Sequence, residues 1–130
     1  MIKYMMGVVL LLATSSAMAG GVVVTSPKNA VASLDQEGVR KVFLGREPTA
    51  VVVFSNSAVR NSFETNVLGK AGSDLKSFWS RLVFTGRAKA PEEKASDAEV
   101  KAFVSGNPNA YGYIDESAVD GTVKVLYRFQ

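Results

Sequence analysis

Short apolar runs alternate along the chain with polar turns and with segments whose apolar positions recur every three or four residues. Residues 22–24 and 50–54 are continuous apolar runs rich in β-branched side chains, which is typical of strands buried on both faces. Residues 111–114 form a third short run, in which Gly112 indicates a close backbone approach or a bulge. Residues 123–129 alternate apolar and polar side chains, as in a half-exposed edge strand. The pattern therefore predicts about four strands.

Four other segments carry apolar residues at helical spacing, and each lies between a serine that can cap a helix and a glycine that can end one. The expected helices follow Ser33, Ser57, Ser73 and Ser96 and end before Gly45, Gly69, Gly86 and Gly106. Trp79 lies in phase with the apolar stripe of the third helix, so a core position is favoured over a role as a ligand platform. Residues 87–95 are expected to form a polar loop.

The alternation of strands and helices predicts a single α/β domain with three layers, in which helices cover both faces of a mixed, mostly parallel sheet. Residues 22–54 read as strand, helix and strand, and their length favours a right-handed βαβ unit. The chain has 130 residues, which is long enough for one core without disulfides.

The first 19 residues have the three parts of a secretory signal peptide. Lys3 gives a positive start, residues 5–13 are apolar, and Ala17-Met18-Ala19 is a cleavage site of the small-x-small type. We therefore expect a signal peptide at residues 1–19, cleavage after Ala19, and a folded domain at residues 20–130 in the periplasm, without membrane insertion after cleavage. A retained N-terminal anchor is the alternative.

Composition excludes several kinds of chemistry. The chain has no cysteine and no histidine, so it offers no disulfide, no thiolate nucleophile, no Cys/His zinc site and no Ser–His or Cys–His catalysis. Its formal charge of +3 is too small and too scattered to indicate nucleic-acid binding. Asp115 and Glu116 are adjacent carboxylates in a turn, and such neighbours are usually solvated and point apart. We therefore expect no catalytic residues, no metal and no cofactor.

The candidate site is the polar turn Ser55-Asn56-Ser57, which follows the strand at residues 50–54 and precedes a helix. In an open α/β sheet such a turn lies at the carboxyl edge, where ligands bind. Ser57 is the expected N-cap and Arg60 lies one turn into the helix, so unpaired backbone N–H groups and a guanidinium would converge on an anion. In the alternative interpretation the serines only cap the helix and Arg60 is solvated.

Several segments, in this order along the chain, resemble phosphate-type ABC-transporter substrate-binding proteins. The matching segments are Val22-Val23-Val24 with Asn29-Ala30-Val31 and Ser33-Leu34, then Val42-Phe43-Leu44-Gly45, residues 51–63, Phe78-Trp79-Ser80-Arg81, and Asn109-Ala110-Tyr111-Gly112-Tyr113-Ile114. The resemblance covers nearly all of residues 20–130 and implies the fold of one lobe of a type 2 periplasmic-binding protein. It also implies a non-catalytic solute-binding function, with phosphate as the ligand and a transporter as the partner.

The chain departs from the family pattern at the ligand. The family's Ser-Gly-Thr is Ser57-Ala58-Val59 here, and its arginine at the strand end falls on Val53, so Arg60 would act as a substitute. The resemblance covers one lobe, so we expect an open site with modest, salt-sensitive affinity. Two hypotheses remain: an exported module that binds phosphate or another oxyanion weakly, and an envelope accessory or protein-interaction module that keeps the fold without a ligand.

Overall fold

The computed structural model describes residues 20–130, so the expected signal peptide lies outside the described residues. Five strands form one open sheet in the order β3-β2-β4-β1-β5. The strands are β1 (Gly21–Thr25), β2 (Val51–Ser55), β3 (Glu92–Lys94), β4 (Ala110–Asp115) and β5 (Lys124–Phe129). The sheet is mixed, as predicted, but it is not mostly parallel: β2 is parallel to β3 and to β4, whereas β1 is antiparallel to β4 and to β5.

The prediction of a βαβ unit over residues 22–54 is wrong. Strand β4 lies between β1 and β2, and it is antiparallel to the first and parallel to the second, so β1 and β2 run in opposite directions. All five residues of β1 are buried, because the strand has neighbours on both edges and lies between helices on both faces. A continuous apolar run reports this burial and contains no information about strand direction.

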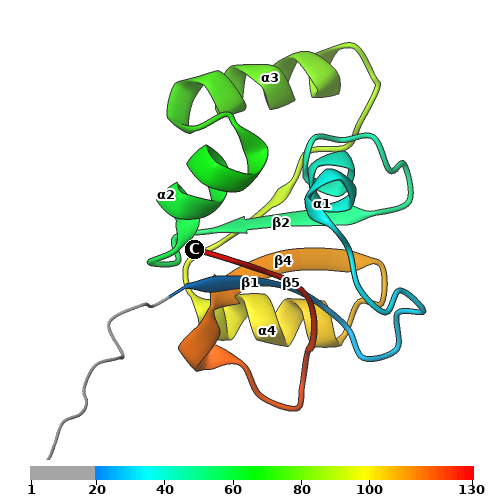
Figure 1. Ribbon diagram of the computed structural model, residues 1–130. Helices are drawn as coiled ribbons and strands as arrows, with labels where there is room; N and C mark the ends of the chain where they lie inside the picture. Colours follow the sequence, from blue (N-terminus) through cyan, green and yellow to red (C-terminus); the bar gives the residue numbers. More distant parts are fainter. Residues whose placement is uncertain (1–19) are drawn as a thin grey trace, which may run out of the picture.

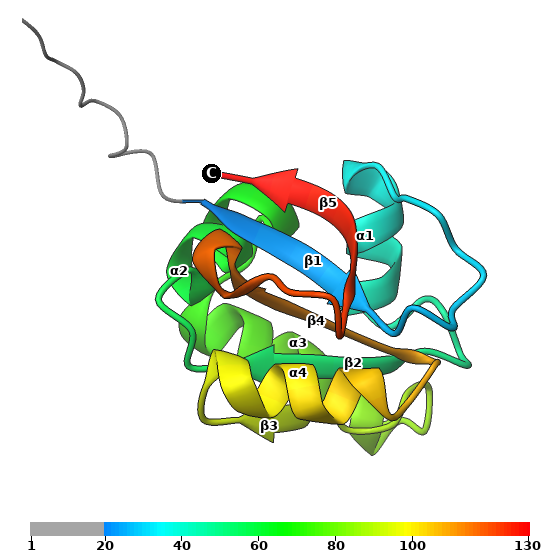
Figure 2. The same cartoon turned by 90° about the horizontal axis from the view of Figure 1, so that it is seen from below.

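Helices cover both faces of the sheet, which confirms the predicted three layers (Figure 1). The helices are α1 (Gln36–Phe43), α2 (Arg60–Ser62), the π-helix η2 (Phe63–Leu68), α3 (Gly72–Phe84), α4 (Asp97–Ser105) and the 3₁₀-helix η3 (Glu116–Ala118). α1, α2 and α3 lie on one face, and α4 lies on the other with η3 beside it, as seen from below in Figure 2. Each face has its own cluster of buried apolar residues.

The predicted helix ends are correct more often than the predicted helix starts. Ser96 caps α4 by accepting a hydrogen bond from the Glu99 N–H at 3.2 Å. The first helix, however, is capped by Asp35 rather than Ser33, and α3 begins after Ala71, without a side-chain cap from Ser73. Gly69 ends η2 in the left-handed conformation, at φ 76°, as its position predicted.

Two further predictions about packing are confirmed. A Cβ on Gly112 would lie 2.8 Å from Val100 Cγ1, so the strand approaches α4 as closely as glycine allows. Trp79 is 6% exposed and its indole N–H donates to the Phe43 carbonyl at 3.1 Å, so it is a core residue.

The short strand β3 was not expected, because residues 92–94 are all charged.

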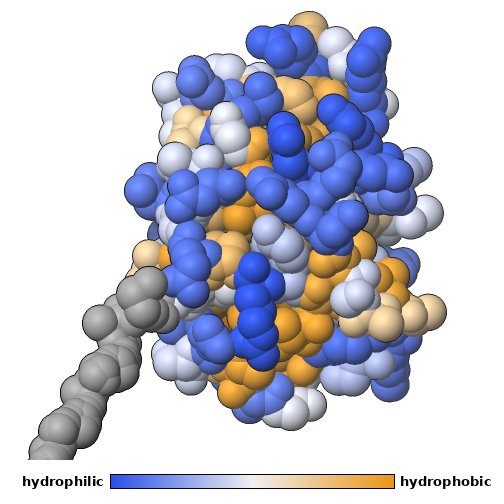
Figure 3. Space-filling view, in the orientation of Figure 1, coloured by the Kyte–Doolittle hydropathy of each residue, from blue (hydrophilic) through white to orange (hydrophobic). Residues whose placement is uncertain are grey.

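The surface mixes polar and apolar residues. On the face seen in Figure 3, hydrophilic residues surround smaller apolar areas, which is ordinary for a globular domain. Within residues 20–130, no helix is both long and apolar enough to cross a membrane.

Candidate functional site

The candidate site lies at the carboxyl end of β2, where the sheet opens. β2 pairs with β4 only through Val51 and Val52, and with β3 through the three residues that follow. At the end of the strand the Tyr113 hydroxyl replaces the missing ladder bonds: it accepts from the Ser55 N–H at 3.0 Å and donates to the Ser55 carbonyl at 3.1 Å. Burial of this side chain raises the pKa of Tyr113 to about 12. The hydroxyl therefore holds the turn after β2 against β4.

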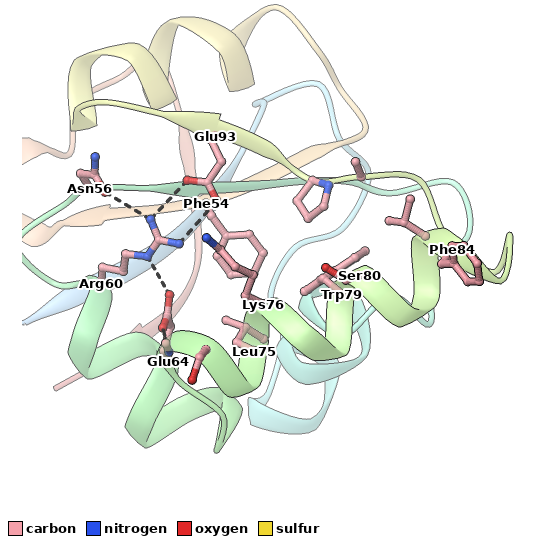
Figure 4. A pocket seen from close by; sticks show the side chains of 15 residues that line it. Phe54, Asn56, Arg60, Glu64, Leu75, Lys76, Trp79, Ser80, Phe84 and Glu93 are labelled. Atoms are coloured by element: carbon pink, nitrogen blue, oxygen red, sulfur yellow. Dashed lines mark hydrogen bonds and ion pairs between the residues drawn. The ribbon is translucent and has the colours of Figure 1, made fainter.

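Arg60 is the first residue of α2, and its guanidinium is surrounded by acceptors (Figure 4). Nε donates to Glu64 Oε2 at 2.7 Å. Nη1 lies 3.2 Å from the Ser55 carbonyl, 3.3 Å from Asn56 Oδ1 and 3.2 Å from Glu93 Oε1, and Nη2 lies 3.4 Å from Glu93 Oε2. The arginine is therefore partly enclosed: two carboxylates already bind it, and its side chain is 30% exposed.

Glu64 is the inner of these two carboxylates. It is 5% exposed, and its second oxygen accepts from the Gly72 N–H at 3.0 Å. Burial lowers the pKa of Arg60, but the Glu64 hydrogen bond, with Tyr113 and Glu93 nearby, more than reverses this effect and raises it above its ordinary range. Glu64 therefore fixes the charged arginine side chain and joins α2 to the first turn of α3.

Glu93 is the outer carboxylate and is held less firmly. Its side chain is 61% exposed, and its two oxygens meet Nη1 and Nη2 of Arg60 at 3.2 and 3.4 Å. Charge-assisted N–H···O bonds usually measure about 2.7–2.9 Å. The outer edge of the guanidinium thus holds a carboxylate in a two-oxygen arrangement, at distances that indicate a weak ion pair.

The structure brings together part of the predicted site. Asn56 and Arg60 are in contact and line one pocket, and the Ser55 carbonyl also binds the guanidinium. The Ser55 side chain is buried, and its Oγ has no hydrogen-bond partner among residues 20–130. Ser57 does not line the pocket, and its Oγ accepts from the Val59 N–H at 3.3 Å.

The expectation that Ser57 caps the helix is wrong. α2 begins at Arg60, its N-cap is Val59, and no side chain caps it. Only three α-helical residues precede the π-helical segment, so a helix dipole contributes little to the site. Any anion at this turn would therefore depend on side chains, with Arg60 foremost.

A pocket of about 830 Å³ extends from Arg60 along α3. Its polar end contains Asn56, Arg60, Glu64, Lys76 and Glu93, and its remaining large side chains are apolar: Phe54, Leu75, Trp79, Val83, Phe84 and Pro91 (Figure 4). Glu64, Lys76 and Glu93 were not among the site residues expected from the sequence. The spacing of four residues between Arg60 and Glu64 was a usable signal, because such pairs meet on a helix.

Asp115 and Glu116, the adjacent carboxylates at the end of β4, bind different groups. Asp115 accepts from the Ser117 N–H and hydroxyl, whereas Glu116 forms an exposed ion pair with Arg128 at 2.6 Å. The two carboxylates serve different partners. In the part of the chain that the structure describes, no cluster of three acidic residues could hold a metal ion.

No family model matches the sequence, and no curated protein matches it. Solved structures do match the fold. A putative phosphate ABC transporter substrate-binding protein from Clostridium perfringens, solved with bound phosphate, has a TM-score of 0.66 at 22% identity. An ABC-type phosphate transport receptor from Vibrio cholerae has a TM-score of 0.64 at 20% identity, and PstS from Borrelia burgdorferi has 0.60 at 14%.

Each match covers 83% of this chain but only 44%, 45% and 46% of the three proteins, so the chain spans less than half their length. At these identities the likeness establishes the fold alone. The chain has the fold of phosphate ABC-transporter substrate-binding proteins, and the matched part of those proteins is about the size of one lobe.

Proposed function

We propose that the domain is a non-catalytic, exported solute-binding module, and that it binds a small oxyanion at Arg60 by exchange with Glu93. The observation that carries this proposal is the two-oxygen contact of Glu93 with Nη1 and Nη2 of the guanidinium. Phosphate and sulfate present pairs of oxygens in the same way. The position that an external oxyanion needs is therefore occupied by a side chain that imitates one.

The exchange is favourable in energy only because the two carboxylates differ. Glu93 is exposed, and an exposed ion pair contributes about 0–1 kcal/mol. Glu64 is buried and remains in place, so Arg60 keeps its orientation when Glu93 leaves. The amide of Asn56, which contacts the guanidinium through its oxygen, also offers N–H donors beside the incoming anion.

The binding of phosphate by this chain is supported by its fold, which it shares with proteins described as phosphate transport receptors. On the same grounds we propose a transporter or another envelope protein as the partner. We further propose that residues 1–19 are a signal peptide and that the mature chain is periplasmic. Expression with export should yield a protein whose mass begins at Gly20, and an intact Met1 in the exported fraction would contradict this part.

Isothermal titration with phosphate and sulfate, and with chloride as the control anion, tests the proposal. Glu93→Gln removes the competing charge and keeps the size of the side chain. We expect it to bind phosphate about fivefold more tightly than the wild type, since that factor corresponds to about 1 kcal/mol. Arg60→Lys keeps a positive charge but loses the planar fork, so it should bind more weakly. Absence of binding by both wild type and Glu93→Gln at millimolar anion would refute the proposal.

A protein-interaction module is the second candidate. Phe84 is 92% exposed and its neighbour Val83 is 40% exposed, at the end of α3 and beside the pocket. An exposed large apolar pair is a feature of interaction surfaces and needs no anion. If neither phosphate nor sulfate binds the wild type or Glu93→Gln, this candidate takes first place.

A further inference from the structure

The pocket is much larger than an inorganic anion requires. Its volume of about 830 Å³ falls within the range of roughly 300–1,000 Å³ that is typical of sites for organic ligands. An oxyanion at Arg60 would fill only the polar end of this space. The remainder runs along α3 toward Phe84, as the arrangement of the labelled side chains in Figure 4 shows.

The helix α3 lines this remainder with two stripes. Leu75, Trp79 and Val83 are spaced four residues apart and form an apolar stripe along one side of the helix. Gly72, Lys76 and Ser80 have the same spacing on the adjoining side of the helix and are small or polar, and Phe84 ends this second stripe with an apolar side chain. The apolar stripe faces the interior at its beginning and becomes exposed at Val83, so the trough is open at the end distant from Arg60.

The charges at the polar end favour a negative ligand group. Arg60 and Lys76 are balanced by Glu64 and Glu93, and Lys76 forms no ion pair within residues 20–130. When Glu93 moves away, the remaining three groups carry a net charge of +1. A cationic ligand would find only the exposed Glu93, because Glu64 is 5% exposed, and it would lie next to the guanidinium.

From these observations we infer that the pocket binds an amphiphilic organic anion, whose charged head displaces Glu93 from Arg60 and whose apolar body lies along α3 as far as Phe84. The inference rests on the exchange of Glu93 in the proposed function and extends it from a free oxyanion to an organic one. Apolar contact with the trough then adds affinity that phosphate or sulfate cannot obtain.

The experiment compares inorganic phosphate, hexyl phosphate and hexanol by isothermal titration. Each methylene that enters the trough should tighten binding by about threefold to fourfold, since its burial is worth about 0.8 kcal/mol. We expect hexyl phosphate to bind about 100-fold more tightly than phosphate. This factor is smaller than full burial of all six carbons would give, because the trough is open at one end. Trp79 is the single tryptophan of the chain and lines the pocket, so its fluorescence gives a local second readout.

Variants assign the binding to the two ends of the pocket. Phe84→Ser should weaken hexyl phosphate about fivefold and leave phosphate unchanged, and its exposed position protects the fold. Val51→Ser is the matched control, because it removes another exposed apolar side chain outside this pocket, and it should change neither affinity. Glu93→Gln should strengthen the binding of hexyl phosphate.

The possible failures are distinct. Equal affinity for phosphate and hexyl phosphate would overturn the inference and leave the proposed function intact. Equal affinity for hexanol and hexyl phosphate would refute the claim that the ligand's charged head binds at Arg60. Binding of hexyl phosphate that is insensitive to both Phe84→Ser and Glu93→Gln would place the ligand elsewhere and overturn the inference as well. If neither phosphate compound binds wild type or Glu93→Gln, the proposed function fails too.

Discussion

The ion pair between Arg60 and Glu64 should be the most costly polar contact of the site to disrupt. Glu64 is almost completely buried and accepts two hydrogen bonds, from Arg60 Nε at 2.7 Å and from the Gly72 N–H at 3.0 Å. Both donors bind the same carboxylate, so loss of either oxygen leaves one of them without its acceptor. Glu64→Gln keeps the shape of the side chain but replaces one acceptor oxygen by an NH₂ group.

Either orientation of the glutamine amide leaves a conflict, because its NH₂ group must face Arg60 Nε or the Gly72 N–H. One hydrogen bond of a charged group is lost, at about 1.5–3 kcal/mol, and a buried donor is left without a partner. Removing one partner of a fully buried ion pair costs about 3–5 kcal/mol, but Arg60 is 30% exposed and keeps Glu93. We therefore expect the free energy of unfolding to fall by about 2–3 kcal/mol, which corresponds to about 8–15 °C in Tm for a domain of this size.

Urea unfolding followed by Trp79 fluorescence measures this change, since the buried indole becomes solvated on unfolding. Glu93→Gln is the internal control: it removes the other carboxylate of the same arginine, but an exposed one, so it should cost less than about 1 kcal/mol. If Glu64→Gln unfolds at the same urea concentration as the wild type, the argument that Glu64 anchors Arg60 is wrong. Equal losses for the two variants would show that burial does not separate their roles.

Two other positions give independent predictions. Tyr113→Phe removes the hydroxyl that bridges the N–H and carbonyl of Ser55, and the free energy of unfolding should fall by about 1–2 kcal/mol in urea. Burial raises the pKa of Tyr113 from 10.0 to about 12, so the unfolded state loses this proton first as pH rises. The free energy of unfolding of the wild type should therefore decrease between pH 10 and 12 more steeply than that of Tyr113→Phe. Parallel pH curves for the two proteins would contradict this cause. Gly112→Ala brings a Cβ to 2.8 Å from Val100 and should destabilise the domain by about 1–3 kcal/mol. Gly121→Ala is the control and should be neutral, because a Cβ at this position meets nothing within 4 Å. Equal urea midpoints for these two variants would refute the close packing at Gly112.

The apolar pattern predicts where elements lie because it records burial, and it fails where another interaction decides the structure. Ser33 and Gln36 have the spacing of a capping box, yet Asp35 caps α1. The reason is a tertiary contact: the Leu34 N–H donates to the Leu126 carbonyl on β5 at 2.9 Å, so residue 34 is held against the sheet and the helix begins only after it. No local pattern contains this contact.

Strand β3 illustrates the opposite error. Residues 92–94 are charged and carry no apolar alternation, but they pair in parallel with Val53, Phe54 and Ser55 of β2. The alkyl part of Lys94 brings its ammonium group to 4.5 Å from the centre of the Phe103 ring, so the charge is placed over an aromatic face. A central strand nearby and a favourable surface contact thus suffice for a strand that its own sequence does not indicate.

The sequence predicted that Asn56 and Arg60 lie at one site, and they are in contact, but it did not predict the carboxylates that surround the guanidinium. The order of strand, turn and helix along the chain predicts the turn after β2 and the position of Arg60. Glu64 follows Arg60 by four residues, a spacing at which side chains meet on a helix. Glu93 lies 33 residues further on and reaches the guanidinium only because β3 pairs with β2. Together with Glu64, this long-range carboxylate neutralises a guanidinium that local sequence presents as a free cation.

That neutralisation changes what kind of ligand the site can select. For any external anion, the gain at Arg60 is the difference between its own ion pair and the one that Glu93 gives up, and for an inorganic oxyanion this difference is small at an exposed position. Glu93 is tethered to the same chain, so dilution does not weaken its competition as it weakens that of a free ion. A ligand that also buries apolar surface against α3 would add a contribution beyond the ion pair that it exchanges with Glu93. Under the proposed exchange, Glu93 would lower the affinity of every anion by the same factor, so apolar contact with α3 would decide which anions still bind.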